Sequence, residues 1–192
     1  MTPVEGLRWE RRRKLQVREA FSAGLERYRN ESGEPRAFYL ACADYLLQGQ
    51  HRLVAQDLRL AEMLNARVPA EQAADHELID ALFDRLQQAQ NAADAFAAAI
   101  AAYRASSGHD HTAFETAAVE YLHVIVNVLG ARSHSLRHLT TTLFSDQDWA
   151  RIVDLTPEFL SAEEGLFKAV QGAADEGLDP DSFPATRPTS GS

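Results

Sequence analysis

The sequence predicts an all-α protein, an antiparallel bundle of four long helices plus an N-terminal helix. Five segments repeat apolar residues at the three- and four-residue spacing of an α-helix. No segment shows the alternation of polar and apolar residues between turns that is typical of a β-strand. Because the segments are long and the turns between them are short, successive helices are expected to pack nearly antiparallel.

The first two helices are expected on either side of the turn ESGEP. The N-terminal helix is predicted over residues 12–30, and it ends where the glycine and the proline of this turn interrupt the helical pattern. The second helix is predicted over residues 35–65 and ends before Pro69.

The third helix is predicted from Pro69 or Glu71 to residue 105, where SSGHD interrupts the pattern, and the fourth over residues 112–144. The segment NAADAFAAAIAAY of the third helix has small side chains on all sides, so a neighbouring helix can approach closely. That neighbour is either another helix of this chain or a second copy, and a homodimer is therefore one of two alternatives.

The fifth helix is expected to begin after Ser145, which is a good N-cap residue, with acidic residues in the first turn. Thr156 and Pro157 predict a kink, or a restart with Thr156 as the cap. Residues 1–171 are interpreted as one helical-bundle domain. Residues 172–192 are rich in Gly, Pro, Ser and Asp, and are expected to form a flexible C-terminal tail.

Composition excludes several classes of function. A net charge of −9 disfavours general binding of nucleic acid, which requires a basic surface. The basic segment RWERRRK is interpreted as the solvated start of a helix. The single cysteine excludes an intrachain disulfide and cysteine-rich metal sites. No apolar run approaches the ~18 residues of a membrane-spanning helix, so a soluble protein is expected. The single cysteine fits a reducing compartment and the N-terminus does not resemble a secretory signal, so a cytoplasmic protein is expected.

Four predicted helices each place a polar residue at the centre of the apolar stripe. These residues are Asp57, Gln90, Arg132 and Glu163. Because an isolated buried charge is costly, they are expected to meet one another, an ion or a ligand. Two interpretations remain open at this point. The polar layer is either a structural network that fixes helix register, or the lining of a ligand or metal cavity in the core.

The stretch EYLHVIVNVLGARSHSLRH of the fourth helix divides into two parts. Glu120, His123 and Asn127 are flanked by valines on both sides and are expected to be buried. His134 and His138 neighbour serine, arginine and threonine residues, which is typical of a surface.

Several motifs resemble those of hemerythrin-like and ferritin-like helical-bundle metal proteins. Glu120 and His123 have the Glu-x-x-His spacing of ferritin-like di-iron sites. His134 and His138, and His111 with Glu115, have His-x-x-x-His and His-x-x-x-Glu spacings similar to those of hemerythrin-like proteins. The segments RLVAQDLRLAEML and DWARIVDLTPEFLSAEEGLF also look like parts of that family.

The resemblance implies a metal ion, iron or another transition metal, with oxidative chemistry if the metal is iron. The candidate metal ligands are Asp57, Glu120, His123 and Glu163. A guanidinium is unfavourable beside a dication, so Arg132, with Gln90, is expected instead to bind a small anionic ligand. The alternative function is a non-enzymatic interaction or regulatory bundle, in which a buried Asp57, Arg132 and Glu163 network is structural.

Overall fold

The computed structural model describes residues 2–30, 33, 35–106, 111–129 and 136–184, and over these residues the chain is all-helical, without strands. The α-helices are α1 (Pro3–Asn30), α2 (Arg36–Arg67), α3 (Ala73–Ala105), α4 (Thr112–Val124), α5 (Arg137–Leu143), α6 (Asp146–Val153) and α7 (Pro157–Ala173). A π-helical turn, η1 (Ile125–Leu129), follows α4, and a 3₁₀ turn, η2 (Pro180–Ser182), follows α7. The all-α prediction is confirmed.

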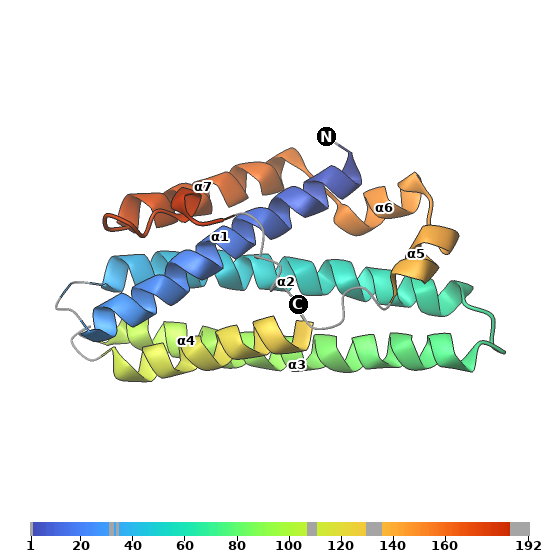
Figure 1. Cartoon of the computed structure of the whole chain (residues 1–192), viewed down its shortest axis with the longest axis horizontal. Helices are drawn as coiled ribbons and strands as arrows, with labels where there is room; N and C mark the ends of the chain where they lie inside the picture. Colours follow the sequence, from blue (N-terminus) through green and yellow to red (C-terminus); the bar gives the residue numbers. More distant parts are fainter. Residues whose placement is uncertain (1, 31–32, 34, 107–110, 130–135, 185–192) are drawn as a thin grey trace, which may run out of the picture.

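Helix α2 is at the centre of the arrangement and contacts α1, α3, α5, α6 and α7. In Figure 1, α2 and α3 lie side by side along the long axis, with α4 beside one part of α3. Helix α1 crosses α2 obliquely, and α7 and α6 lie over successive parts of α2. None of the described helices has an apolar stretch long enough to cross a bilayer.

Two of the predicted long helices are interrupted. The fourth divides into α4, the π-helical turn and α5, and residues 130–135 between them lie outside the described part. The fifth divides into α6 and α7. Asp154 ends α6 in the left-handed conformation, with φ at 46°, and the Thr156 side chain then caps α7 by accepting from the Phe159 amide. The restart predicted at Thr156 and Pro157 is therefore observed, as is the Ser145 cap on α6.

The segment after α7 differs from the flexible tail that its composition predicts. Leu178 is buried, and η2 contacts α1. The Tyr28 hydroxyl donates to Asp175 Oδ2 at 2.5 Å, and Arg27 donates to the Glu176 carbonyl at 2.9 Å. Residues 174–184 are therefore part of the packed structure, because apolar side chains in this polar sequence find a place against α1.

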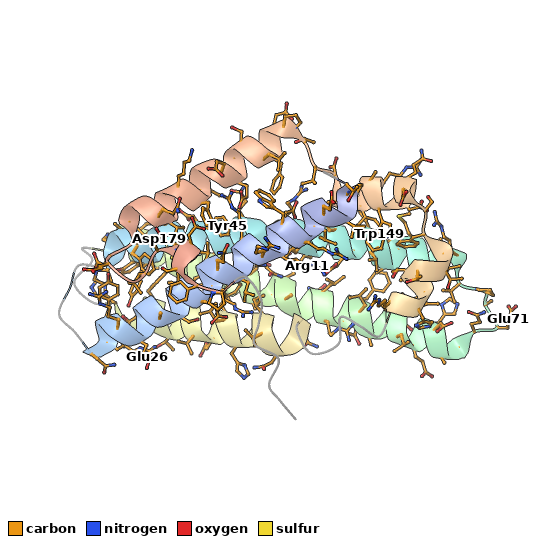
Figure 2. All side chains as sticks on the ribbon, turned by 45° about the horizontal axis from the view of Figure 1, so that its top comes forward. Arg11, Glu26, Tyr45, Glu71, Trp149 and Asp179 are labelled. Carbon is orange, nitrogen blue, oxygen red and sulfur yellow. The ribbon has the colours of Figure 1, made fainter. Side chains whose placement is uncertain are left out.

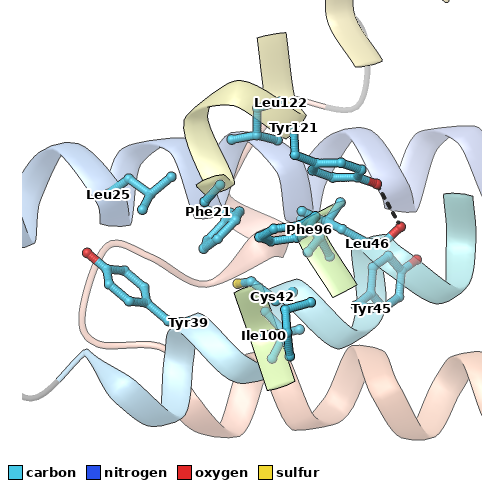
Figure 3. Packing of buried hydrophobic residues seen from close by; sticks show 14 of the residues in the cluster. Phe21, Leu25, Tyr39, Cys42, Tyr45, Leu46, Phe96, Ile100, Tyr121 and Leu122 are labelled. Atoms are coloured by element: carbon cyan, nitrogen blue, oxygen red, sulfur yellow. Dashed lines mark hydrogen bonds between the residues drawn. The ribbon is translucent and has the colours of Figure 1, made fainter. Parts of the chain in front are cut away.

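The apolar core consists of two clusters. The larger one is rich in aromatic side chains from α1, α2, α3, α4 and α7, and Tyr121 within it donates to the Leu46 carbonyl (Figure 3). The smaller one joins the C-terminal part of α2 to the N-terminal part of α3 and to α5. Only Val54, partly buried, packs against both among the described residues. Gln50, Gln56 and Asp57 lie on this same part of α2, so polar groups gather where the apolar core is divided.

Candidate functional site

A cleft of about 300 Å³ opens beside the smaller apolar cluster, between α1, α2, α3, α5 and α6. One part of its lining is apolar and consists of Leu7, Leu60, Leu82, Leu136, Trp149 and Ile152. The other part is polar and consists of Arg11, Gln56, Asp57, Arg85, Arg137, Thr140 and Thr141. Figure 2 labels Arg11 on α1 and Trp149 on α6, which line the cleft from different helices. The cleft is thus amphipathic.

Helical spacing explains why each helix supplies both kinds of side chain. Residues three or four positions apart lie on one face of a helix. Leu7 and Arg11 are related in this way on α1, and Leu82 and Arg85 on α3. Each helix therefore brings a cation to the same face as an apolar side chain.

Three arginines and one carboxylate line the cleft. Arg11 Nη2 lies 3.8 Å from Asp57 Oδ1, whereas Arg85 and Arg137 form no ion pair with any residue in the described ranges. Three guanidinium groups and one carboxylate leave two net positive charges at the cleft. Although the whole chain is acidic, its local field at this place attracts anions.

The Asp57 side chain is only 28% exposed, and this burial changes the pKa of its carboxyl group. Loss of hydration raises the pKa of Asp57, while the positive charges of Arg11, Lys14 and Arg85 act in the opposite direction. The positive charges therefore offset part of the cost of burying the Asp57 carboxylate.

Gln56 is almost fully buried, at 2% exposure, at the bottom of the cleft. Its Nε2 donates to Glu10 Oε2 and to the Val153 carbonyl, both at 3.1 Å. Because both partners are acceptors, the orientation of the amide is fixed. Its Oε1 has no donor among the described residues.

A second polar group lies between α1, α2 and α7 and contains Glu163. Arg13 Nη1 donates to Glu163 Oε2 at 2.6 Å, and the Tyr45 hydroxyl donates to Glu163 Oε1 at 2.5 Å. The Arg13 guanidinium also stacks over the Phe167 ring at 4.0 Å. Both carboxylate oxygens of Glu163 therefore have donors, which is the arrangement expected of a structural network.

Of the four residues that the sequence predicted to meet, the described Asp57, Gln90 and Glu163 each have a different partner. Glu163 is buried, as predicted, but its arginine partner is Arg13, and Asp57 pairs with Arg11. Gln90 is partly buried and donates to Asp94 Oδ1 on its own helix at 2.8 Å. Arg132 lies outside the described residues.

The predicted burial of Glu120, His123 and Asn127 is wrong, since all three are exposed. Only the side of α4 that carries Tyr121 and Leu122 faces the core, and the valines beside the three residues do not enclose them; Val119 itself is 42% exposed. His138, predicted at a surface, is exposed and lies 3.2 Å from Asp75. His134 lies outside the described residues.

The four candidate metal ligands are not brought together. Glu120 and His123 are exposed on α4, and Asp57 and Glu163 each lie beside an arginine. Among the described residues, no group of three or more His, Cys, Asp or Glu side chains could hold a metal ion. This donor set therefore does not fit a di-iron centre. Iron or another transition metal remains a prediction, which elemental analysis of the purified protein tests.

The residues that line the cleft were largely missed by projection of the helices. Projection placed Asp57 at the centre of α2, whereas Gln56, one residue earlier and 100° away around the helix, is the more buried. Arg11 belongs to the basic segment RWERRRK, which was interpreted as a solvated helix start. The sequence did contain a signal for Arg11. Leu7 lies one helical turn before it, so the basic segment shares a helix face with an apolar residue.

Comparisons of the chain with family models, curated proteins and solved structures found no match. The resemblance to hemerythrin-like and ferritin-like proteins therefore rests on the sequence motifs alone.

Proposed function

We propose that the protein binds a small amphipathic anion, a medium-chain carboxylate or phosphate monoester, in the cleft between α1, α2, α3, α5 and α6. The observation that carries the proposal is the pair Arg85 and Arg137, two guanidinium groups without an ion pair in the described structure, which line the same cleft as several apolar side chains. We also propose that the scaffold is an antiparallel helical bundle around α2.

Arginine suits the polar end of such a ligand. Its planar guanidinium offers parallel donors to two oxygens of a carboxylate or phosphate, and it stays charged at all relevant pH values. Arg85 and Arg137 come from different helices, so an anion between them is bound from two directions. Asp57 holds Arg11 at 3.8 Å and limits the excess positive charge before a ligand arrives.

The apolar part of the lining suits a short hydrocarbon chain or a ring. Trp149 packs its ring against Phe144, with centroids 5.6 Å apart, and also lines the cleft. The volume of about 300 Å³ is far above the roughly 10–15 Å³ that one water molecule needs, so the cleft has room for a ligand of about ten non-hydrogen atoms. Octanoate, with about ten non-hydrogen atoms, is therefore a suitable probe. At about 0.6 kcal/mol per atom, its dissociation constant is expected on the order of 10–100 µM.

Trp149 provides the assay. The chain has two tryptophans, and a Trp9→Phe variant leaves Trp149 as the only one. Titration with octanoate and with octyl phosphate is expected to change Trp149 fluorescence, whereas neutral octanol binds at least about tenfold more weakly. The affinities of octanoate and octyl phosphate distinguish a carboxylate site from a phosphate site. Equal binding of octanol and both anions, or no binding of any probe at millimolar concentration, rejects the proposal.

The matched variants are Arg85→Met and Arg12→Met. Loss of one charge-assisted hydrogen bond costs about 1.5 kcal/mol or more, so Arg85→Met is expected to weaken octanoate binding by roughly tenfold. Arg12 is exposed on α1 and does not line the cleft, and Arg12→Met makes the same change in net charge. Equal losses in the two variants would mean that only overall charge matters.

A further inference from the structure

Lys14 on α1 is a cation without a carboxylate at hydrogen-bonding distance in the described structure. Its Nζ donates instead to Gln50 Oε1 at 2.5 Å. Lys14 also lines a small cavity of about 30 Å³ between α1, α2 and α7. The two acids of that cavity already have partners, because Glu10 pairs with Arg52 and Glu163 with Arg13. This cavity is separate from the cleft proposed to bind an anion.

The Gln50 side-chain amide, which contacts Lys14, has a partner for its oxygen but none among the described residues for its nitrogen. The side chain is fully buried, at 0% exposure. In the structure the amide oxygen Oε1 is the atom that accepts from Lys14 Nζ, and a neutral amine or an ammonium can donate to it equally. Gln50 Nε2 is then left without an acceptor among the described residues. An unpaired buried donor of this kind is unfavourable, so an acceptor beside Lys14 would stabilise it.

The surroundings favour a neutral amine at this position. Loss of hydration lowers the pKa of Lys14 to about 7; the charge of Asp57 opposes the shift, while Arg18 and Arg11 add to it. At pH 7.5, therefore, a substantial fraction of Lys14 side chains is the neutral amine, which has a free electron pair on nitrogen. An ordinary lysine, with a pKa of about 10.4, is neutral in roughly one molecule in a thousand at this pH.

We propose that Lys14 is a carbamylation site, at which the neutral amine adds carbon dioxide from the small cavity. The nitrogen electron pair forms a bond to the carbon of CO₂, the electrons of one C–O π bond become an additional lone pair on that oxygen, and one proton leaves the nitrogen to solvent. The product is a carbamate anion on Nζ. No oxidant or reductant takes part.

The carbamate supplies the acceptor that Gln50 Nε2 lacks among the described residues. A carbamate presents an N–H and an oxygen side by side, which is the same pattern as an amide. Its N–H donates to Gln50 Oε1 as the amine does, and its oxygen accepts from Gln50 Nε2, which now lacks a partner. The positive charges of Arg11 and Arg18, which disfavour an ammonium here, attract the new anion, while the charge of Asp57 opposes it.

The cavity has room for a small reactant beside Lys14. A cavity needs about 10–15 Å³ to hold one water molecule, so about 30 Å³ accommodates a molecule of three atoms. Carbon dioxide is small, uncharged and weakly hydrated, and the apolar side chains of Phe159 and Leu166 also line the cavity.

The sequence provides a natural internal control, because Lys168 is the only other lysine. Its side chain is 70% exposed and pairs with Glu164. The full-length protein is incubated with bicarbonate at pH 7.5 and treated with triethyloxonium, which converts a carbamate into a stable ethyl carbamate. Peptides are then mapped by mass spectrometry. We expect at least about tenfold more ethyl carbamate on Lys14 than on Lys168, since its neutral fraction is far larger.

The matched variants are Gln50→Met and Gln48→Met. Gln48 lines the same cavity but is exposed, so its replacement leaves the Lys14 partner unchanged. Gln50→Met is expected to lower labelling of Lys14 by roughly fivefold or more, because one to two hydrogen bonds are lost. Circular dichroism verifies that both variants are folded, and the wild-type comparison of the two lysines needs no variant.

Three results would overturn the proposal: no ethyl carbamate on Lys14, equal labelling of Lys14 and Lys168, or equal labelling in Gln50→Met and Gln48→Met. The N-terminal amine, with an ordinary pKa of about 7.7–8.0, shows that trapping worked. None of these outcomes depends on binding of octanoate in the larger cleft.

Discussion

Removal of Arg13 tests whether the Glu163 network holds the bundle together. In Arg13→Met, Glu163 keeps only the Tyr45 hydroxyl, and its side chain is 8% exposed. Breaking a fully buried ion pair costs about 3–5 kcal/mol. The Arg13 side chain is 18% exposed, so solvent reduces the expected loss to about 2–3 kcal/mol. Methionine keeps an apolar contact with the Phe167 ring.

The double variant Arg13→Met, Glu163→Leu separates the pair from its surroundings. It removes both charges and leaves only the Tyr45 hydroxyl without its acceptor, at a cost of about 1 kcal/mol. Glu163→Leu alone is expected to lose about 2 kcal/mol, because Arg13 retains Glu164. The two single losses sum to about 4–5 kcal/mol, so the coupling energy is about 3 kcal/mol or more.

Urea unfolding followed by circular dichroism measures these values. With a slope of about 2 kcal/mol per molar, Arg13→Met is expected to shift the midpoint down by roughly 1–1.5 M, and the double variant by roughly 0.5 M. A double variant whose loss equals the sum of the single losses would refute this reasoning, because the two charges would then act independently. Octanoate affinity is expected to stay unchanged, since neither residue lines the larger cleft.

Two further predictions concern stability. Because the pKa of Lys14 is lowered to about 7, the unfolded chain binds more protons than the folded chain from about pH 7 to the ordinary lysine pKa, and the unfolding free energy rises with pH in this window. The rise ends above about pH 10. Burial raises the pKa values of Tyr39, Tyr45 and Tyr121 in the folded chain, so the tyrosines of the unfolded chain lose their protons first and the unfolding free energy falls. Urea titrations in CO₂-free buffers at pH 6.5 to 9.5 are expected to show the rise in wild type and a flatter profile in Lys14→Met; parallel profiles would contradict it. Ser145→Ala removes the side-chain cap of α6 and is expected to lower the unfolding free energy, measured by urea titration, by about 1 kcal/mol. Ser106, at the C-terminal end of α3, is the control, and Ser106→Ala is expected to lower it less. Equal losses would contradict a specific capping effect.

Local signals in the sequence determined the helical class and many of the helix ends. The 3.6-residue period, the Ser145 and Thr156 caps and the turn residues act over one or two turns, so they can be recognised without knowledge of the partner helix. Glu163 was also recognised as buried, because its neighbours on α7 leave its direction clear.

Which residues pair across helices depended on the tertiary structure. A projection shows which face of one helix is apolar, but it contains no information about which residue of another helix lies opposite. Arg13 pairs with Glu163, and Arg11 with Asp57, because α1 crosses α2 obliquely (Figure 1). Arg11 lies in the part of α1 that extends nine residues further towards the N-terminus than the pattern predicted. The division of the core into two clusters is likewise a result of packing. The sequence by itself therefore determined that polar groups lie in the interior, and only the tertiary structure decided that they surround two separate spaces.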